Sequence, residues 1–141
     1  MKKIIFSLIF ISNILFASTY NLMVKVENLR NNKGVVQFSL YNDAKKFPDE
    51  DLKKYYKQLK QKIKGNSTEV VFRNLPKGIY VVNILHDENS NTKVDKGLIL
   101  PKEGIGLSNY KKVNFFNRPN FKDGSFLLDK DKTIKVKINY F

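Results

Sequence analysis

The sequence predicts a mainly β protein: a single antiparallel β-sandwich of about seven strands, with one amphipathic helix inserted between them. First, apolar and polar residues alternate in several short segments, most clearly at residues 20–29 and 133–140. Second, the chain has 11 Phe and 7 Tyr together with many Val and Ile, which suit half-buried pleated surfaces. Third, clusters of Gly, Asn and Pro separate these segments, whereas no internal repeat or linker divides the chain.

The N-terminal end predicts export. Residues 1–3 form a short positive start, residues 4–16 are almost all apolar, and the small residues Ala17 and Ser18 follow. This order is typical of a secretory signal peptide, and the apolar run is shorter than the roughly 20 residues that a membrane-spanning helix needs. We therefore expect removal of residues 1–17 as a signal peptide. Residues 18–141 are expected to form one domain in the periplasm or outside the cell.

The absence of Cys and the excess of Lys limit how the protein is stabilised and which partners it suits. The chain has no Cys, so in an oxidising compartment it must be held together by apolar packing rather than by disulfides. Its formal net charge is +13, yet only three of its 26 cationic residues are Arg, the usual residue for paired hydrogen bonds to phosphate. A Lys-rich surface favours solubility and loose attraction to anionic lipid or glycan, and it does not favour nucleic acid as a partner.

The first two strands are predicted near the start of this domain. Residues 20–29 alternate with a period of two, as in a half-buried strand. Residues 30–34 form a turn cluster that ends in Gly, and residues 35–41 are a second apolar segment. We expect a β-hairpin over these residues.

Residues 47–64 depart from the β pattern and predict an amphipathic helix. Pro48 suits a first helical position, and three acidic residues follow it near the positive end of the helix dipole. Apolar residues recur at helical spacing: Leu52, Tyr55, Tyr56, Leu59 and Ile63. We expect this stripe to pack against the edge of the sheet. The alternative is that the basic face contacts an anionic membrane or glycan through Lys53, Lys54, Lys57, Lys60 and Lys64.

The remaining strands are predicted at residues 67–72, 79–85, 126–128 and 133–140. The apolar run of residues 79–85 is partly continuous, which indicates a central strand. Between them, residues 96–120 contain three Gly and two Pro and predict long irregular structure.

The loop at residues 86–95 holds the main candidate binding site. Oxygen-bearing side chains and one backbone carbonyl (that of Lys93) would supply the ligands, which are Asp87, Asn89, Asn91, Lys93 and Asp95. Hard cations such as calcium prefer several oxygen ligands of this kind. The pattern begins like an EF-hand loop, but Thr92 stands in place of its Gly and Leu98 in place of its bidentate Glu, so the loop is at best a shorter calcium-type site.

Further ligands for such a cation would be His86, Glu88 and Glu103. The alternative to a cation site is turn chemistry, because Asp and Asn side chains also bond to the backbone two residues further on. The sequence leaves both interpretations open.

His86 is the only His in the chain. A lone His cannot form the multi-His ligand set of most zinc sites, and no Ser or Cys nucleophile stands in a recognisable motif with it. A metal-assisted hydrolase would need the side chains of His86, Asp87, Glu88 and Glu103 to converge in a pocket. Because the other members of a catalytic set are missing, we expect a structural hydrogen-bonding role for His86.

Several segments together resemble a known family. The first two are Phe72-x-Asn74-Leu75-Pro76-x-Gly78-x-Tyr80 and His86-Asp87-Glu88-Asn89-x-Asn91-x-Lys93-x-Asp95. The others are Gly97, residues 99–106, Ser108-Asn109 and Pro119-x-Phe121-x-Asp123-x-x-Phe126. On these residues the chain is similar to the small exported proteins of the domain-of-unknown-function family DUF2141, over essentially all of residues 18–141.

The resemblance implies an exported single β-sandwich, immunoglobulin-like or transthyretin-like, with no established activity. The family pattern usually has Gly at the positions of Ser90 and Thr92 and an aromatic residue at Leu107, so this chain departs from it there.

These observations predict an exported, non-enzymatic module that binds an envelope component or contributes to envelope structure. Its Asp/Asn loop would hold a cation such as calcium or stiffen one end of the sandwich. The second hypothesis is a peripheral binder of anionic lipid or glycan that uses the Lys residues of the predicted helix. The third is the metal-assisted hydrolase.

Overall fold

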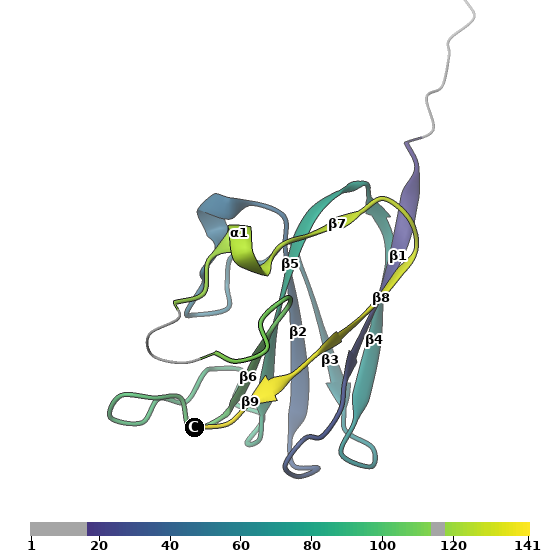
Figure 1. Cartoon of the computed structure of the whole chain (residues 1–141). Helices are drawn as coiled ribbons and strands as arrows, with labels where there is room; N and C mark the ends of the chain where they lie inside the picture. Colours follow the sequence, from purple (N-terminus) through teal and green to yellow (C-terminus); the bar gives the residue numbers. More distant parts are fainter. Residues whose placement is uncertain (1–16, 114–117) are drawn as a thin grey trace, which may run out of the picture.

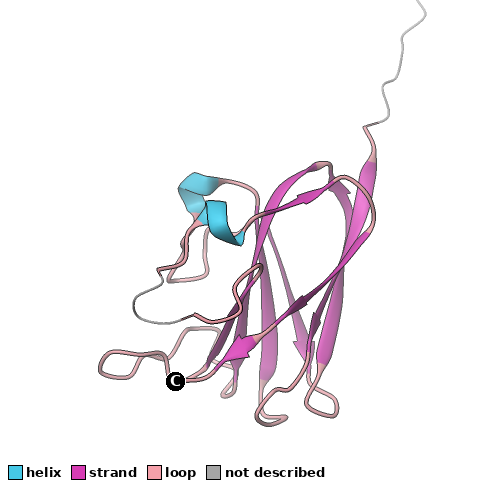
Figure 2. Ribbon diagram, viewed as in Figure 1, coloured by secondary structure: helices cyan, strands magenta, loops and turns pink. Residues whose placement is uncertain are grey.

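The described part of the chain forms two β-sheets (Figures 1 and 2). The computed structural model describes residues 17–113 and 118–141, so the predicted signal peptide lies almost entirely outside the described residues. The three-stranded sheet has the order β4 (Thr68–Pro76), β1 (Thr19–Val26), β8 (Lys132–Val136). The six-stranded sheet has the order β3 (Lys57–Lys62), β2 (Val35–Tyr41), β5 (Gly78–Asp87), β6 (Gly104–Leu107), β9 (Ile138–Asn139), with β7 (Phe126–Leu128) also paired to β5.

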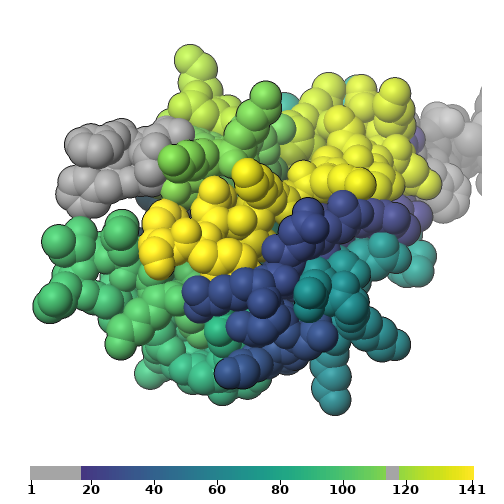
Figure 3. Space-filling model, turned by 60° about the horizontal axis from the view of Figure 1, so that its bottom comes forward, coloured from purple at the N-terminus to yellow at the C-terminus, as the bar shows by residue number. Residues whose placement is uncertain are grey.

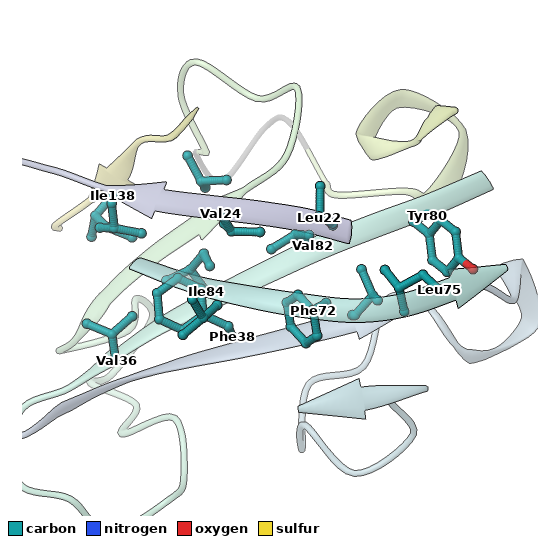
Figure 4. Packing of buried hydrophobic residues seen from close by; sticks show 14 of the residues in the cluster. Leu22, Val24, Val36, Phe38, Phe72, Leu75, Tyr80, Val82, Ile84 and Ile138 are labelled. Carbon is teal, nitrogen blue, oxygen red and sulfur yellow. The ribbon is translucent and has the colours of Figure 1, made fainter. Parts of the chain in front are cut away.

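The predicted mainly β class is confirmed, and the two sheets share one hydrophobic core in a sandwich-like arrangement (Figure 4). Alternate residues of the strands point into it, as the period of two requires. Leu22 and Phe72 come from the smaller sheet, and Phe38 and Ile84 come from the larger one. Each fully buried side chain of this size stabilises the fold by about 1.5–3 kcal/mol relative to an exposed one.

The number and the pairing of the strands differ from the prediction. The described residues form nine strands rather than about seven, and the sheets are not wholly antiparallel, because β1 pairs with β8 in parallel. The predicted hairpin of residues 20–41 is also wrong, since β1 and β2 lie in different sheets. The connection at residues 27–34 crosses between the sheets with Leu29 buried, whereas tight hairpin loops have two to five residues.

The predicted helix at residues 47–64 does not form. Residues 49–56 are an irregular segment, and β3 follows as an edge strand paired with β2. Of the five apolar residues at helical spacing, Leu52 is buried and Ile63 is half-buried against the main core, whereas the other three are exposed. The strand conformation instead satisfies the backbone edge of β2. Lysines on an exposed edge strand also hinder pairing with another chain.

Loops cover the outer face of the six-stranded sheet, which is the face turned away from the three-stranded sheet. The short helices η1 (Ala44–Lys46) and α1 (Phe121–Gly124) lie in these loops (Figure 1). A second apolar cluster fixes them to the sheet: Tyr41, Phe47, Val81, Leu107 and Tyr110. Because both of its faces are covered, β5 is buried along most of its length, as the continuous apolar run predicted. Within the described residues, no helix is long and apolar enough to cross a membrane.

Candidate functional site

A cleft of about 530 Å³ lies on the outer face of the six-stranded sheet. Its floor includes Leu85 and Leu107, one wall is formed by residues 47–52, and the opposite wall comes from residues 94–101. This volume lies in the range of small-molecule sites, which are mostly apolar with few polar groups. A smaller groove of about 280 Å³ lies between the ends of β1, β3 and β4, but Lys and Glu side chains dominate its lining. The larger cleft is therefore the candidate site.

The first wall of the cleft is fixed to the sheet by a buried carboxylate. One oxygen of Asp49, Oδ2, accepts hydrogen bonds from the Tyr41 hydroxyl at 3.2 Å and from the Lys54 N–H at 2.6 Å. Burial, and secondarily the negative charge of Asp49, raise the pKa of Tyr41 well above its usual range. Tyr41 therefore remains a hydrogen-bond donor at every physiological pH. The Phe47 ring packs edge-on against Tyr41, with ring centroids 5.2 Å apart.

The second wall belongs to the loop that contains the predicted Asp/Asn motif. Val94, Ile99, Leu100 and Pro101 supply its apolar lining. At the rim, Lys96 Nζ forms an ion pair with Glu50 of the first wall at 3.1 Å. Both side chains are mostly exposed, so the pair stabilises the fold by at most about 1 kcal/mol.

Asp87 is the buried centre of the motif. Its Oδ1 accepts a hydrogen bond from the Asn91 N–H at 3.0 Å, and its Oδ2 accepts from the Thr92 N–H at 2.8 Å and from Gln37 Nε2 at 2.7 Å. A buried carboxylate needs such donors to offset the loss of hydration. The side chain thus ties the loop to strand β2.

Asp95 closes the outer part of the motif. Its two carboxylate oxygens accept hydrogen bonds from the side-chain amides of Asn89 at 2.6 Å and Asn91 at 2.9 Å. The carbonyl oxygens of these amides accept from the backbone N–H groups of Asn91 and Lys93, each two residues further on. These are the bonds that the turn interpretation predicts.

Glu103 joins the motif to the strand that follows it. Its carboxylate accepts from the Glu88 N–H at 3.1 Å and from the Asp95 N–H at 3.2 Å. Burial is the largest cause that raises the pKa of Glu103, and the negative charges of Asp87 and Asp95 act in the same direction. Hence four carboxyl groups, Asp87, Glu88, Asp95 and Glu103, gather around one loop.

Glu88 faces the connection between the sheets. Its Oε1 accepts from Arg30 Nε at 2.6 Å, and its Oε2 accepts from Asn31 Nδ2 at 3.2 Å. Burial opposes ionisation of Glu88, but the hydrogen bonds from Asn31 and Arg30 and the Arg30 charge outweigh it and lower its pKa. Arg30 also donates to the Lys102 carbonyl at 3.0 Å, so it links the connection to the far end of the loop.

His86 is fully buried and points to the opposite face of β5 from Asp87. Its Nε2 donates to the Lys33 carbonyl at 2.9 Å, since a carbonyl can only accept, so in the neutral ring Nδ1 accepts from the Tyr140 hydroxyl at 2.7 Å. The Tyr140 ring crosses Gly104, where an added Cβ would collide with it. Both ring nitrogens of His86 are thus engaged in structural hydrogen bonds, in line with the role expected for it.

The structure brings most of the predicted ligands together. Side-chain oxygens of Asp87, Asn89, Asn91 and Asp95 all lie in one network, with Glu88 and Glu103 beside it. Each of their carboxylate oxygens accepts an N–H hydrogen bond, and among the described residues no three His, Cys, Asp or Glu side chains are placed to hold a metal ion. The calcium hypothesis therefore stays a prediction, and the turn interpretation accounts for the spacing.

The lysines predicted to form one helical face do not lie on a helix. Lys57 and Lys60 are on β3, and Lys53, Lys54 and Lys64 are in the segments that flank it; all five are exposed. The sequence also gave no indication of Arg30 and Tyr140, whose partners lie 58 and 54 residues away along the chain. The sequence did not predict the cleft either. The apolar residue Phe47 and the long irregular segment at residues 96–120 were the features of the sequence that pointed to it.

A family model described as an uncharacterised protein conserved in bacteria, DUF2141, matches residues 24–136. The chain belongs to DUF2141. The matched residues run from the middle of β1 to the end of β8, so the DUF2141 region contains both cleft walls and the whole Asp/Asn loop, whereas Tyr140 lies beyond it. Comparison with the curated proteins and with the solved structures gave no match.

The backbone of the Asp/Asn loop is left-handed at two residues. Ser90 and Thr92 both have positive φ values, 58° and 68°. Only Gly adopts this region without strain, and a β-branched residue such as Thr is rare there. The loop backbone at Ser90 and Thr92 thus has the conformation that Gly adopts most easily, although both residues carry a side chain.

Proposed function

We propose that this DUF2141 protein is an exported, non-enzymatic binding module whose ligand places an apolar group in the cleft. The observation that carries this proposal is the cleft itself, with apolar side chains from the sheet and from both loop walls around one space of about 530 Å³. Polar and charged groups lie at its margin: Glu50, Lys96 and Arg118. Such a site favours an apolar or amphipathic small molecule.

The walls of the cleft are held in place by hydrogen bonds, which supports a role in ligand binding. The first wall is bonded to the sheet through Asp49 and Tyr41, and the second is braced through Glu103 and Arg30. A site whose walls are already ordered loses less conformational entropy when a ligand enters.

The hydrogen bonding of the acidic groups supports a non-enzymatic role. A hydrolase would need a general acid and base facing a substrate. His86 and Asp87 instead point to opposite faces of β5, and their ring nitrogens and carboxylate oxygens are bonded to other groups. Neither residue lines the cleft.

Export and the finer fold class are part of the same proposal. The positive, apolar and small-residue order at residues 1–18 supports a signal peptide, and hence a location in the periplasm or outside the cell. The two sheets around one core support an immunoglobulin-like or transthyretin-like sandwich.

Binding of the uncharged fluorescent probe N-phenyl-1-naphthylamine to residues 18–141 tests the cleft. Ile105 lines the cleft and is half-buried on β6, so Ile105→Glu puts a carboxylate against the apolar ligand. We expect this variant to bind the probe at least about tenfold more weakly. The matched control is Val71→Glu, which changes a half-buried residue of β4 outside the cleft. Equal loss in both variants, or no binding by the unaltered protein, would contradict the proposal.

A further inference from the structure

Three consecutive apolar side chains are exposed at the tip of the second cleft wall. The exposed fractions are 105% for Leu98, 76% for Ile99 and 40% for Leu100. A scattered single apolar residue on a surface is ordinary, but a contiguous group at a protruding tip marks an interaction site. Figures 1 and 3 show this loop projecting from the body of the molecule.

The backbone of this tip is held in place. Lys96 and Pro101 form an isolated β-bridge, the Gly97 N–H donates to the Leu100 carbonyl at 2.7 Å, and the Lys102 N–H donates to the Asp95 carbonyl at 2.8 Å. Below this turn, Glu103 bonds Asp95, and Arg30 bonds the Lys102 carbonyl. The loop therefore presents its apolar residues outward in a fixed conformation.

Positive charges surround the apolar tip. Lys93, Lys96 and Lys102 flank it in the sequence and are exposed. The acidic groups near them are Glu50, which pairs with Lys96, and the loop carboxylates of Asp87, Glu88, Asp95 and Glu103. The oxygens of these four accept N–H groups of the loop, of Gln37 or of the 30–31 connection. Lys93 and Lys102 are thus available to an anionic surface.

We propose that the tip at residues 97–100 inserts into the interface of a membrane that contains anionic lipid, with Lys93 and Lys102 against the headgroups. Exposed apolar side chains with lysines beside them suit the membrane interface. The apolar side chains enter the boundary between headgroups and acyl chains, and the lysines contact the negative headgroups. Other acidic partners would match the charge but not the fully exposed Leu98. The surface differs from the predicted helix face, because no residue of β3 belongs to it.

This inference goes beyond the proposed ligand cleft and can fail independently of it. Leu98 does not line the cleft, so its substitution leaves probe binding unchanged. Ile105 is on β6 and is half-buried, outside the exposed residues of the tip, so Ile105→Glu leaves vesicle binding unchanged. If both hold, Ile99 and Leu100, which belong to the tip and to the cleft wall alike, place the cleft at the membrane surface.

Flotation with lipid vesicles tests the proposal on residues 18–141, which contain every described strand and lack the apolar run of residues 4–16 that would itself bind lipid. We expect binding to vesicles of phosphatidylglycerol and phosphatidylcholine, and weak binding to phosphatidylcholine alone. Leu98→Ser removes apolar surface without changing charge and should weaken binding by about tenfold or more. The matched control Leu127→Ser changes an exposed apolar residue of β7 and should bind like the unaltered protein.

A second pair of variants tests the charges. Lys93→Glu with Lys102→Glu should abolish the preference for anionic vesicles, whereas Lys57→Glu with Lys60→Glu on β3 should retain it. Loss in the β3 pair alone would move the contact to the Lys-rich edge strand and overturn the proposal. Unchanged vesicle binding by Leu98→Ser, or self-association through the tip without any vesicle binding in sedimentation velocity, would overturn it as well.

Discussion

The sequence made a specific prediction for the loop at residues 86–103 and for the segment at residues 47–64. The structure agrees with the turn interpretation of the loop but has a strand instead of the predicted helix in the segment. In the loop, the Asp and Asn side chains bond to partners two to six residues away, with Gln37 as the one distant partner of Asp87. In the segment, the decisive partner is strand β2: the Tyr56 N–H donates to the Leu40 carbonyl at 2.7 Å, and β3 then pairs along β2. Local hydrogen bonding can be predicted from spacing, but pairing with a distant edge overrides helical periodicity.

The largest expected effect is in the loop. Asp87→Ala leaves Gln37 and the N–H groups of Asn91 and Thr92 without their buried acceptor, and we expect a loss of about 3–5 kcal/mol in unfolding free energy. Asp95→Ala is the control, because its oxygens accept only from exposed amides, and should cost about 1 kcal/mol. Urea denaturation measures both values. Similar losses in the two variants would mean that Asp87 does not anchor the loop.

Thr92→Gly should stabilise the protein by about 1 kcal/mol, because it relieves a β-branched residue at φ 68° while keeping the N–H bond to Asp87. Thr133→Gly on β8 is the matched control, since its backbone is an ordinary strand, and it should destabilise the protein by about 0.5–1 kcal/mol. Melting temperatures measure both changes. A loss of stability in Thr92→Gly would show that the loop backbone is not strained at this residue.

Stability should depend on pH through Glu88, by up to about 1 kcal/mol. Its pKa is lowered in the folded protein, so its contribution is present above the ordinary value of 4.5 and is lost as the pH falls through the lowered folded value. Glu88→Gln should therefore be less stable than the unaltered protein at neutral pH, and the difference should vanish in acid. Urea titrations from neutral pH into acid measure this; a difference that persists unchanged in acid would exclude the charge as its cause.

Lys60→Thr tests whether residues 57–62 form a strand or a helix. On the exposed strand β3 a β-branched residue should raise stability by about 0.5 kcal/mol, whereas in a helix it would lower it. Lys53→Thr, in the irregular segment before the strand, should have no effect. Thermal melts distinguish these outcomes, and a decrease in Lys60→Thr would favour the helix.

The smallest expected effect is that of calcium. Because the loop carboxylates already accept N–H groups, millimolar calcium should shift the melting temperature by less than about 1 °C, with magnesium as the control. A calcium-specific rise of roughly 5–10 °C that is lost in Asp87→Ala would instead establish the cation site.

The sequence predicted what depends on neighbouring residues. The β class follows from periods of two, the strands near residues 35–41 and 79–85 follow from apolar segments between turn signals, and the clustering of Asp87 with Asn91 follows from short polar side chains. It did not predict which strands pair, because β1 carries the same alternation whether it meets β2 or β4. Arg30 and Tyr140 reach the site only through the sheet topology, so no local pattern marks them.

The parallel pair of β1 and β8 sets the order in which the chain can fold. β1 is the first of the described strands in the sequence, yet it lies in the middle of its sheet, and its register pairs Leu22 with Lys132, 110 residues further on. Until β8 joins the sheet, one edge of β1 is open and can pair with other chains, as any open edge can. Folding is therefore completed by the last strands to emerge, and truncation before residue 132 would leave an aggregation-prone protein.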